Sequence, residues 1–215
     1  MTQTAGPEKP SDERLFLCLA VIVAVIFGAG GFFLILALSQ HEKIAGIKPD
    51  HPRRLVDFSL TDRTGRTVTR AELAGKILVV DFLFTSCGLT CPEVNRRMAE
   101  IQRLTVNQPD VRLVSLTVDP RTDTPAALMK FGGRFGADTN RWLMLTGDKA
   151  VLYQLIGASF LAQDLNDPFS YMPGNFSHTE HIAVVDARGN VQAYFDGLRR
   201  ETADEVVAEI SRLRK

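Results

Sequence analysis

The feature that most constrains this 215-residue chain is an apolar run from Leu15 to Leu38 that contains no charged side chain. About 20 such residues in a helix suffice to cross the hydrocarbon core of a bilayer. A buried core helix is one alternative, but such helices seldom lack a polar face over this length. A cleaved signal peptide is another, but its apolar stretch is shorter and ends in small residues. We therefore predict one uncleaved transmembrane helix.

This anchor divides the chain into segments. Residues 1–14 form an N-terminal tail, 15–38 the transmembrane anchor and 39–54 a linker with two prolines and no apolar period. Residues 55–215 remain, which is enough for a single domain with a buried core. We predict one domain held at a membrane surface.

Charge patterning indicates the kind of membrane but does not orient the anchor. Basic residues lie on both sides of it, and large domains translocate largely regardless of nearby charge. The tail carries Glu8, Asp12 and Glu13, whereas organelle transit peptides are poor in acids, so a bacterial inner membrane is favoured. The 25 basic and 25 acidic residues cancel, which argues against nucleic-acid binding driven by phosphate neutralisation.

Strand and helix patterns alternate along the domain. Hairpins are expected at Val56–Leu60 with Thr67–Thr69 and at Ile182–Val185 with Val191–Phe195, further strands at Ile77–Phe84, Val111–Val118 and Trp142–Leu145, and helices from about Cys91, from Thr124 toward Phe135, over Asp148–Ile156 and over Ala203–Leu213. This order predicts an α/β fold with a mixed central sheet. A thioredoxin-like fold matches it.

Two cysteines follow the strand at Ile77–Phe84. Ligands gather beyond the carboxyl ends of strands in open α/β sheets, which places Cys87 in that crevice, while Cys91 begins a helix whose N-terminus favours thiolate. Three residues separate the two cysteines, whereas a thioredoxin redox motif normally has two. Cysteines that merely pack are the alternative. Two cysteines within five residues at a strand-to-helix turn favour a metal or redox site.

A histidine would complete such a metal site. His41 and His51 lie in the linker, whereas His178 and His181 immediately precede a predicted strand, on a loop that faces the cysteine turn in a thioredoxin-like fold. Two thiolates and one imidazole favour copper, because zinc more often takes a fourth protein ligand or keeps an open catalytic position. Cys18 lies inside the apolar run and is given no role.

Four stretches of the domain resemble the Sco/SenC family, membrane-anchored thioredoxin-like copper chaperones for assembly of cytochrome c oxidase. They are Ala74-Gly75-Lys76 before the apolar strand, Thr85-Ser86-Cys87-Gly88-Leu89-Thr90-Cys91-Pro92, the segment Ser115 to Pro125 with its Asp119-Pro120 and Asp123-Thr124-Pro125, and Ser177-His178-Thr179. The resemblance extends from Val56 to the C-terminus. The single N-terminal anchor matches as well.

The resemblance implies which residues of this chain form the copper site. Cys87 and Cys91 match the family's two thiolate ligands, which are also its redox disulfide pair. His178 matches the imidazole ligand, because its distance to the turn at Asp186 fits and that of His181 does not.

The same resemblance indicates two acidic positions near the site, and the chain departs from the family pattern at one position. Asp119 and Asp123 match acidic positions near the site, although Asp123 could instead help to open the helix at Pro125. Gly88 stands where the family usually has proline, and glycine loosens the turn. The three ligands are nevertheless all present.

The implied function is that of a copper-binding assembly factor, not an enzyme. Its partners would be the copper-site subunit of cytochrome c oxidase, other copper carriers or thiol reductants, and the lipid bilayer, with the domain facing the periplasm. A membrane-tethered thiol–disulfide oxidoreductase that reduces the cysteines of that subunit is the alternative, and it has no need of His178. A thiol peroxidase is a weaker third hypothesis, because it needs one activated cysteine beside an arginine.

Overall fold

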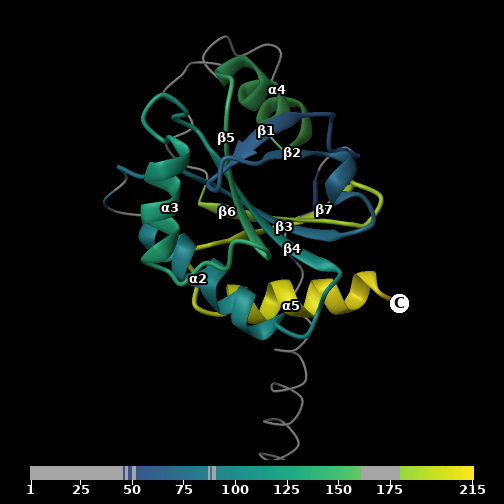
Figure 1. The fold of residues 1–215 in the computed structure, drawn as a ribbon. Helices are drawn as coiled ribbons and strands as arrows, with labels where there is room; N and C mark the ends of the chain where they lie inside the picture. Colours follow the sequence, from purple (N-terminus) through teal and green to yellow (C-terminus); the bar gives the residue numbers. More distant parts are fainter. Residues whose placement is uncertain (1–45, 47, 50–51, 87, 89–90, 161–179) are drawn as a thin grey trace, which may run out of the picture. The chain divides into compact units, whose positions relative to one another are not determined.

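A seven-stranded mixed sheet organises the computed structural model, which describes residues 46, 48–49, 52–86, 88, 91–160 and 180–215 (Figure 1). Its elements are β1 (Ser59–Asp62), β2 (Thr67–Thr69), the 3₁₀ turn η2 (Ala71–Leu73), β3 (Ile77–Leu83), α2 (Cys91–Leu104), β4 (Val111–Thr117), α3 (Pro125–Gly133), β5 (Trp142–Thr146), α4 (Lys149–Ser159), β6 (His181–Val185), β7 (Val191–Asp196) and α5 (Thr202–Leu213). The predicted anchor lies outside the described residues. Within them, no helix combines the length and the apolar character needed to cross a membrane.

The strands lie in the order β2-β1-β5-β4-β3-β6-β7. The central strands β3, β4 and β5 are parallel, while β6 and β7 on one side and β1 and β2 on the other are added antiparallel. Every residue of β3 is buried, as expected for a strand covered on both faces. The mixed α/β sheet and the predicted order of elements are therefore confirmed.

Side chains pack on both faces of the sheet. On one face α2, α3 and α5 cover an apolar layer that includes Val79, Met98 and Ile210. On the other face α4 and η2 cover a second layer that includes Val80 and Leu155 (Figure 1). Successive residues of β3 thus contribute to opposite layers, because side chains alternate along a strand.

Two helix starts agree with the sequence prediction, and some boundaries differ. Thr124 caps α3 by accepting a hydrogen bond from the N–H of Ala127, and Asp148 caps α4 by accepting from two backbone N–H groups. Helix α3 ends at Gly133, before the predicted Phe135, and paired glycines disfavour further helix. Strand β1 begins at Ser59 rather than Val56.

Candidate metal centre

Cys91 is the first residue of α2 and follows the carboxyl end of β3. Its side chain is buried, and the amide of Asn95, one turn later, donates a hydrogen bond of 2.8 Å to the Cys91 carbonyl. The unpaired N–H groups and the dipole of a helix N-terminus favour the thiolate form of such a cysteine. Cys91 is therefore placed where a thiolate ligand is expected.

The other two predicted ligands, Cys87 and His178, lie outside the described residues. Among the residues that are described, no three His, Cys, Asp or Glu side chains form a group that could hold a metal ion. Gly88, between the two cysteines, is exposed, and a Cβ built on it would meet no heavy atom within 4 Å. The space around this position therefore does not require glycine.

Asp123 fixes the chain just before the cysteine turn. Its buried carboxylate accepts hydrogen bonds from the backbone N–H of Thr85 at 3.0 Å and from the Thr85 hydroxyl at 2.6 Å. The hydroxyl of Thr117, at the end of β4, donates to the same carboxylate. Asp123 thus joins the segment after β3 to the end of β4, two residues before Cys87.

Asp119 shapes the same loop through its backbone. Its N–H donates to the Thr117 hydroxyl at 3.0 Å, and its carbonyl accepts from the N–H groups of Thr122 and Asp123. This turn presents the Asp123 carboxylate to Thr85. Thr124, and not Asp123, caps the helix that begins at Pro125. The Asp123 carboxylate therefore does not serve as the helix cap.

The entry to β6 lies against the first turn of α2. The N–H of Gly197 donates to the carbonyl of Glu180 at 2.7 Å, and a Cβ at Gly197 would lie 2.6 Å from that oxygen and 3.1 Å from both methyl groups of Val94. Only glycine allows this close approach. His181 is the first residue of β6 and its side chain is exposed.

The structure also shows a buried polar group that the sequence analysis missed. Asp81 lies in the middle of β3 and is fully buried, on the face covered by α2. Ser115 of β4 donates a hydrogen bond to Asp81, and the Trp142 indole donates to Ser115 at 2.8 Å. Burial raises the pKa of the Asp81 carboxyl to about 7, against the opposing effect of the hydrogen bond from Ser115. Asp81 is the only charged residue in its apolar strand. That contrast in the sequence could have indicated a buried carboxyl.

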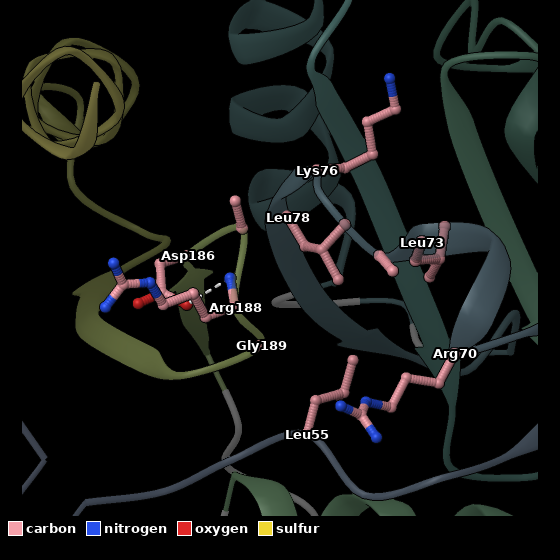
Figure 2. A pocket seen from close by; sticks show the side chains of 10 residues that line it. Leu55, Arg70, Leu73, Lys76, Leu78, Asp186, Arg188 and Gly189 are labelled. Atoms are coloured by element: carbon pink, nitrogen blue, oxygen red, sulfur yellow. Dashed lines mark hydrogen bonds between the residues drawn. The ribbon is translucent and has the colours of Figure 1, made fainter.

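A pocket elsewhere in the domain has different chemistry. It lies between η2, the start of β3 and the β6–β7 turn, at the end of β3 opposite to the cysteines (Figure 2). Its side chains include Arg70, Lys76 and Arg188. The carboxylate of Asp186 in its wall is occupied by donors from its own turn, including the backbone N–H groups of Arg188 and Asn190. The pocket lining contains neither cysteine nor histidine.

Comparison with known proteins assigns the family. The family model described as SCO1/SenC matches residues 48–215, which is most of the chain. The chain belongs to the SCO1/SenC family. An SCO2-like protein of Rickettsia felis is 30% identical over 190 residues, which cover 82% of this chain and 88% of the relative.

Solved structures of Sco proteins share the fold. BsSco, reported with a disulfide switch and as a member of the Sco family of cytochrome c oxidase assembly proteins, has a TM-score of 0.65 and 25% identity, covering 78% of this chain and 96% of its own. ScoI of Bradyrhizobium japonicum with copper bound has a TM-score of 0.58 and 26% identity, covering 74% and 98%. The thioredoxin-like fold predicted from the sequence is thereby confirmed.

Proposed function

We propose that this protein is a copper-binding assembly factor whose cargo is Cu(I), held by the thiolates of Cys87 and Cys91 and the imidazole of His178. The observation that carries the proposal is the placement of Cys91 at the buried N-terminus of α2, beyond the carboxyl end of β3. Two thiolates with one imidazole form a soft ligand set suited to copper. ScoI, which shares the fold, is a copper-bound protein.

The position of Glu180 supports a ligand from the segment that precedes β6, and the family resemblance selects His178 within it. The Glu180 carbonyl lies against Gly197, which in turn lies beside Val94 in the first turn of α2. His178 precedes Glu180 by two residues, and two residues span at most about 7 Å.

The same two cysteines form the proposed redox pair. Copper needs thiolate sulfur, and a disulfide offers none, so metal loading and thiol oxidation exclude each other. BsSco, with its disulfide switch, is a relative in which thiol chemistry accompanies an assembly role. We propose that copper delivery is the main function and that the alternative, reduction of the oxidase subunit's cysteines, would use the same pair without His178.

Copper titration of the anaerobically purified, reduced full-length chain tests this function. We expect about one Cu(I) per chain, and a large loss of affinity in His178→Ala that leaves the Cys87–Cys91 disulfide able to form and be reduced. His181→Ala is the matched control. If both histidine variants keep full copper affinity, neither histidine is a ligand, and the oxidoreductase hypothesis becomes the stronger one.

A second experiment tests the coupling between oxidation and copper. Bound Cu(I) should shield both thiols from alkylation, and mild oxidation should abolish Cu(I) binding. Thiol titration with and without stoichiometric Cu(I), in a Cys18→Ser background, measures both effects. Equal Cu(I) affinity of the oxidised and reduced chains would show that these cysteines are not the copper site.

We also propose that the domain at 55–215 is tethered by the apolar segment at 15–38 to the bacterial inner membrane and faces the periplasm. The uncharged apolar run supports the tether, and a site that serves an oxidase copper centre requires the periplasmic face. A C-terminal alkaline phosphatase fusion should be active. An inactive phosphatase fusion with an active cytoplasmic reporter would contradict this orientation.

A further inference from the structure

Basic side chains gather at the end of the domain opposite to the cysteine turn, where β3 begins. Arg70, Lys76 and Arg188 line the pocket at this end (Figure 2). The backbone of Arg54 forms a bridge with Asn190, which lies two residues after Arg188 in the β6–β7 turn. Arg54 and Arg188 are both exposed, and neither has an ion-pair partner among the described residues.

The basic region continues onto the start of β4. Lys76 donates a hydrogen bond to the Pro109 carbonyl at 3.3 Å, and Arg112 donates to the same oxygen at 3.0 Å. Arg214, just after α5, pairs with Asp110 beside them. We call this region the basic end, and it contains Arg54, Arg70, Lys76, Arg112, Arg188 and Arg214.

Acidic residues offset only part of this charge. Arg70 pairs with Asp57, and Glu72 of η2 pairs with Arg66, which adds no net charge. The carboxylate of Asp186 is held by donors of its own turn. Whereas the whole chain carries 25 basic and 25 acidic residues, the six residues of the basic end lie among three acidic ones, namely Asp57, Asp110 and Asp186.

The directions of the basic side chains indicate the shape of their partner. Lys76 and Arg188 extend in different directions from the pocket and do not point toward one another (Figure 2). A site for one small anion has a few convergent polar groups, whereas basic residues spread over a surface are attracted to an array of anionic lipid headgroups. The basic end therefore fits an extended anionic surface.

The linker from the predicted anchor joins the domain at the basic end. The N–H of Leu55 donates to the Gly189 carbonyl at 2.8 Å, and the N–H of Val191 donates to the Arg53 carbonyl at 2.9 Å. The chain that follows the apolar run is thus paired with the β6–β7 turn beside Arg188. This connection favours a membrane as the anionic surface.

Upstream, the linker already lies against β7. A Cβ built on Gly46 would lie 2.7 Å from the Phe195 ring and 2.9 Å from the Cβ of Ala193, so the backbone packs closely there. From Leu38, the last residue of the apolar run, to Gly46 the chain spans at most about 30 Å. A tether this short keeps the domain at the bilayer and raises the effective concentration of headgroups at its surface.

We propose that the basic end docks on anionic phospholipid headgroups of the membrane that holds the anchor. This inference rests on the tether in the proposed function and not on copper binding. The seven residues of β3 separate the basic end from the cysteine end by about 23 Å. Docking therefore turns the cysteine turn away from the bilayer and leaves it open to a protein partner.

Energy transfer from Trp142, the sole tryptophan, to a dansyl-labelled lipid measures docking in the full-length chain. The chain is reconstituted into vesicles of phosphatidylcholine, with or without phosphatidylglycerol, that carry the label in both leaflets. We expect more transfer with phosphatidylglycerol, and a loss of this difference between about 0.05 and 0.5 M salt. Inorganic phosphate at constant ionic strength should leave the transfer unchanged. Displacement by phosphate would show a pocket for a single anion and overturn the docking surface.

A pair of charge reversals locates the docking surface. Each basic residue near an anionic surface strengthens binding about fivefold, so Arg54→Glu with Arg188→Glu should weaken docking at least about tenfold. The control, Arg121→Glu with Arg200→Glu, changes the net charge equally but replaces exposed residues at the cysteine end, after β4 and β7, and should keep the lipid-dependent transfer. Equal transfer by the parent in both kinds of vesicle, or equal losses in the two double variants, would overturn the proposal.

Two further measurements separate docking from the proposed function. Flotation with phosphatidylcholine vesicles reports the anchor alone, so its loss would count against the tether. Cu(I) titration of Arg54→Glu with Arg188→Glu should match the parent, and failure of both to bind copper would count only against the copper site. Loss of the lipid-dependent transfer in a chain that floats and binds copper counts only against docking.

Discussion

The two faces of β3 differ in one residue. Toward α4 the strand presents Leu78, Val80 and Phe82, all apolar, whereas toward α2 it presents Asp81 between apolar neighbours. Both faces exclude water equally, because every residue of the strand is buried. The α4 face therefore serves packing alone, while the α2 face carries a carboxyl that lowers stability.

The comparison indicates where the central strand gives up stability. A buried carboxyl costs free energy even when one oxygen is hydrogen-bonded, and an apolar side chain of similar volume would stabilise the sheet more. The carboxyl lies under the helix that begins with Cys91 rather than under α4. The following predictions test whether the two faces are independent.

The largest effect on stability is expected when a large side chain is truncated to alanine on either face of β3. Phe82→Ala removes a buried ring that packs edge-on against Phe160, with ring centroids 5.4 Å apart, and should lower the free energy of unfolding by about 3–5 kcal/mol. Leu83→Ala, on the α2 face, should cost about 2–5 kcal/mol. Urea unfolding followed by Trp142 fluorescence measures both.

Only Leu83→Ala should also change the ionisation of Cys91, because it alters packing beneath α2. The Cβ chemical shift of ¹³C-labelled Cys91 against pH reports this ionisation. If Phe82→Ala shifts that titration as far as Leu83→Ala does, the two faces are not independent.

The second prediction concerns the pH dependence of stability. The pKa of Asp81 is about 7 in the folded chain, above its unfolded value of about 3.9, so between these values the unfolded chain loses a proton that the folded chain keeps. The contribution of Asp81 is fully present below about pH 4, and the free energy of unfolding then falls by on the order of 4 kcal/mol as the pH rises to about 7.

Asp81→Asn should abolish this fall, since the amide does not titrate. The variant should match the parent near pH 4 and exceed it by up to that amount at pH 8 in urea unfolding. Parallel pH profiles for variant and parent would show that Asp81 does not titrate in this range.

A smaller effect is expected at the loop beside the cysteine turn. Asp123→Asn keeps the size of the side chain but weakens its hydrogen bonds from Thr85 and Thr117, which should cost about 1–3 kcal/mol of stability. Release of Thr85 should also weaken Cu(I) binding by about tenfold. Competition with a Cu(I) chelator measures the affinity.

The neighbouring Thr124→Ala serves as the control for Asp123→Asn. It removes the cap of α3, which costs about 1 kcal/mol, without touching Thr85. Its copper affinity should therefore stay at the parent value. A similar loss of affinity in both variants would mean that general destabilisation, not the anchoring of Thr85, weakens the site.

The smallest effect is expected for His181→Ala. The side chain is exposed at the start of β6, so stability should change by less than about 0.5 kcal/mol and copper affinity should stay unchanged. Thermal unfolding and the same chelator competition provide the measurements. A clear loss of copper affinity would contradict the assignment of His178 as the only histidine ligand.

Local sequence was sufficient to predict most of the fold. The apolar run at Ile77–Phe84, the helical spacing after Cys91 and the Thr124-Pro125 start of α3 each depend on residues close in the chain. Each forms the predicted element, although β3 ends at Leu83. Strand ends were less accurate, because the hydrogen bond from the Val56 N–H to Ser159 joins residues far apart in sequence. The predicted placement of Cys91 also followed from local order alone.

Tertiary structure decided what surrounds that cysteine. Nothing near Asp123 in the sequence indicates that its carboxylate holds Thr85, and nothing near Asp81 indicates its hydrogen bond from Ser115. These relations arise because parallel strands and a packed helix bring distant polar groups into one water-free layer, where each must find a partner or change its pKa. The sequence alone predicted which groups carry the chemistry, whereas the packing between β3 and α2 buried the Asp81 carboxyl and raised its pKa.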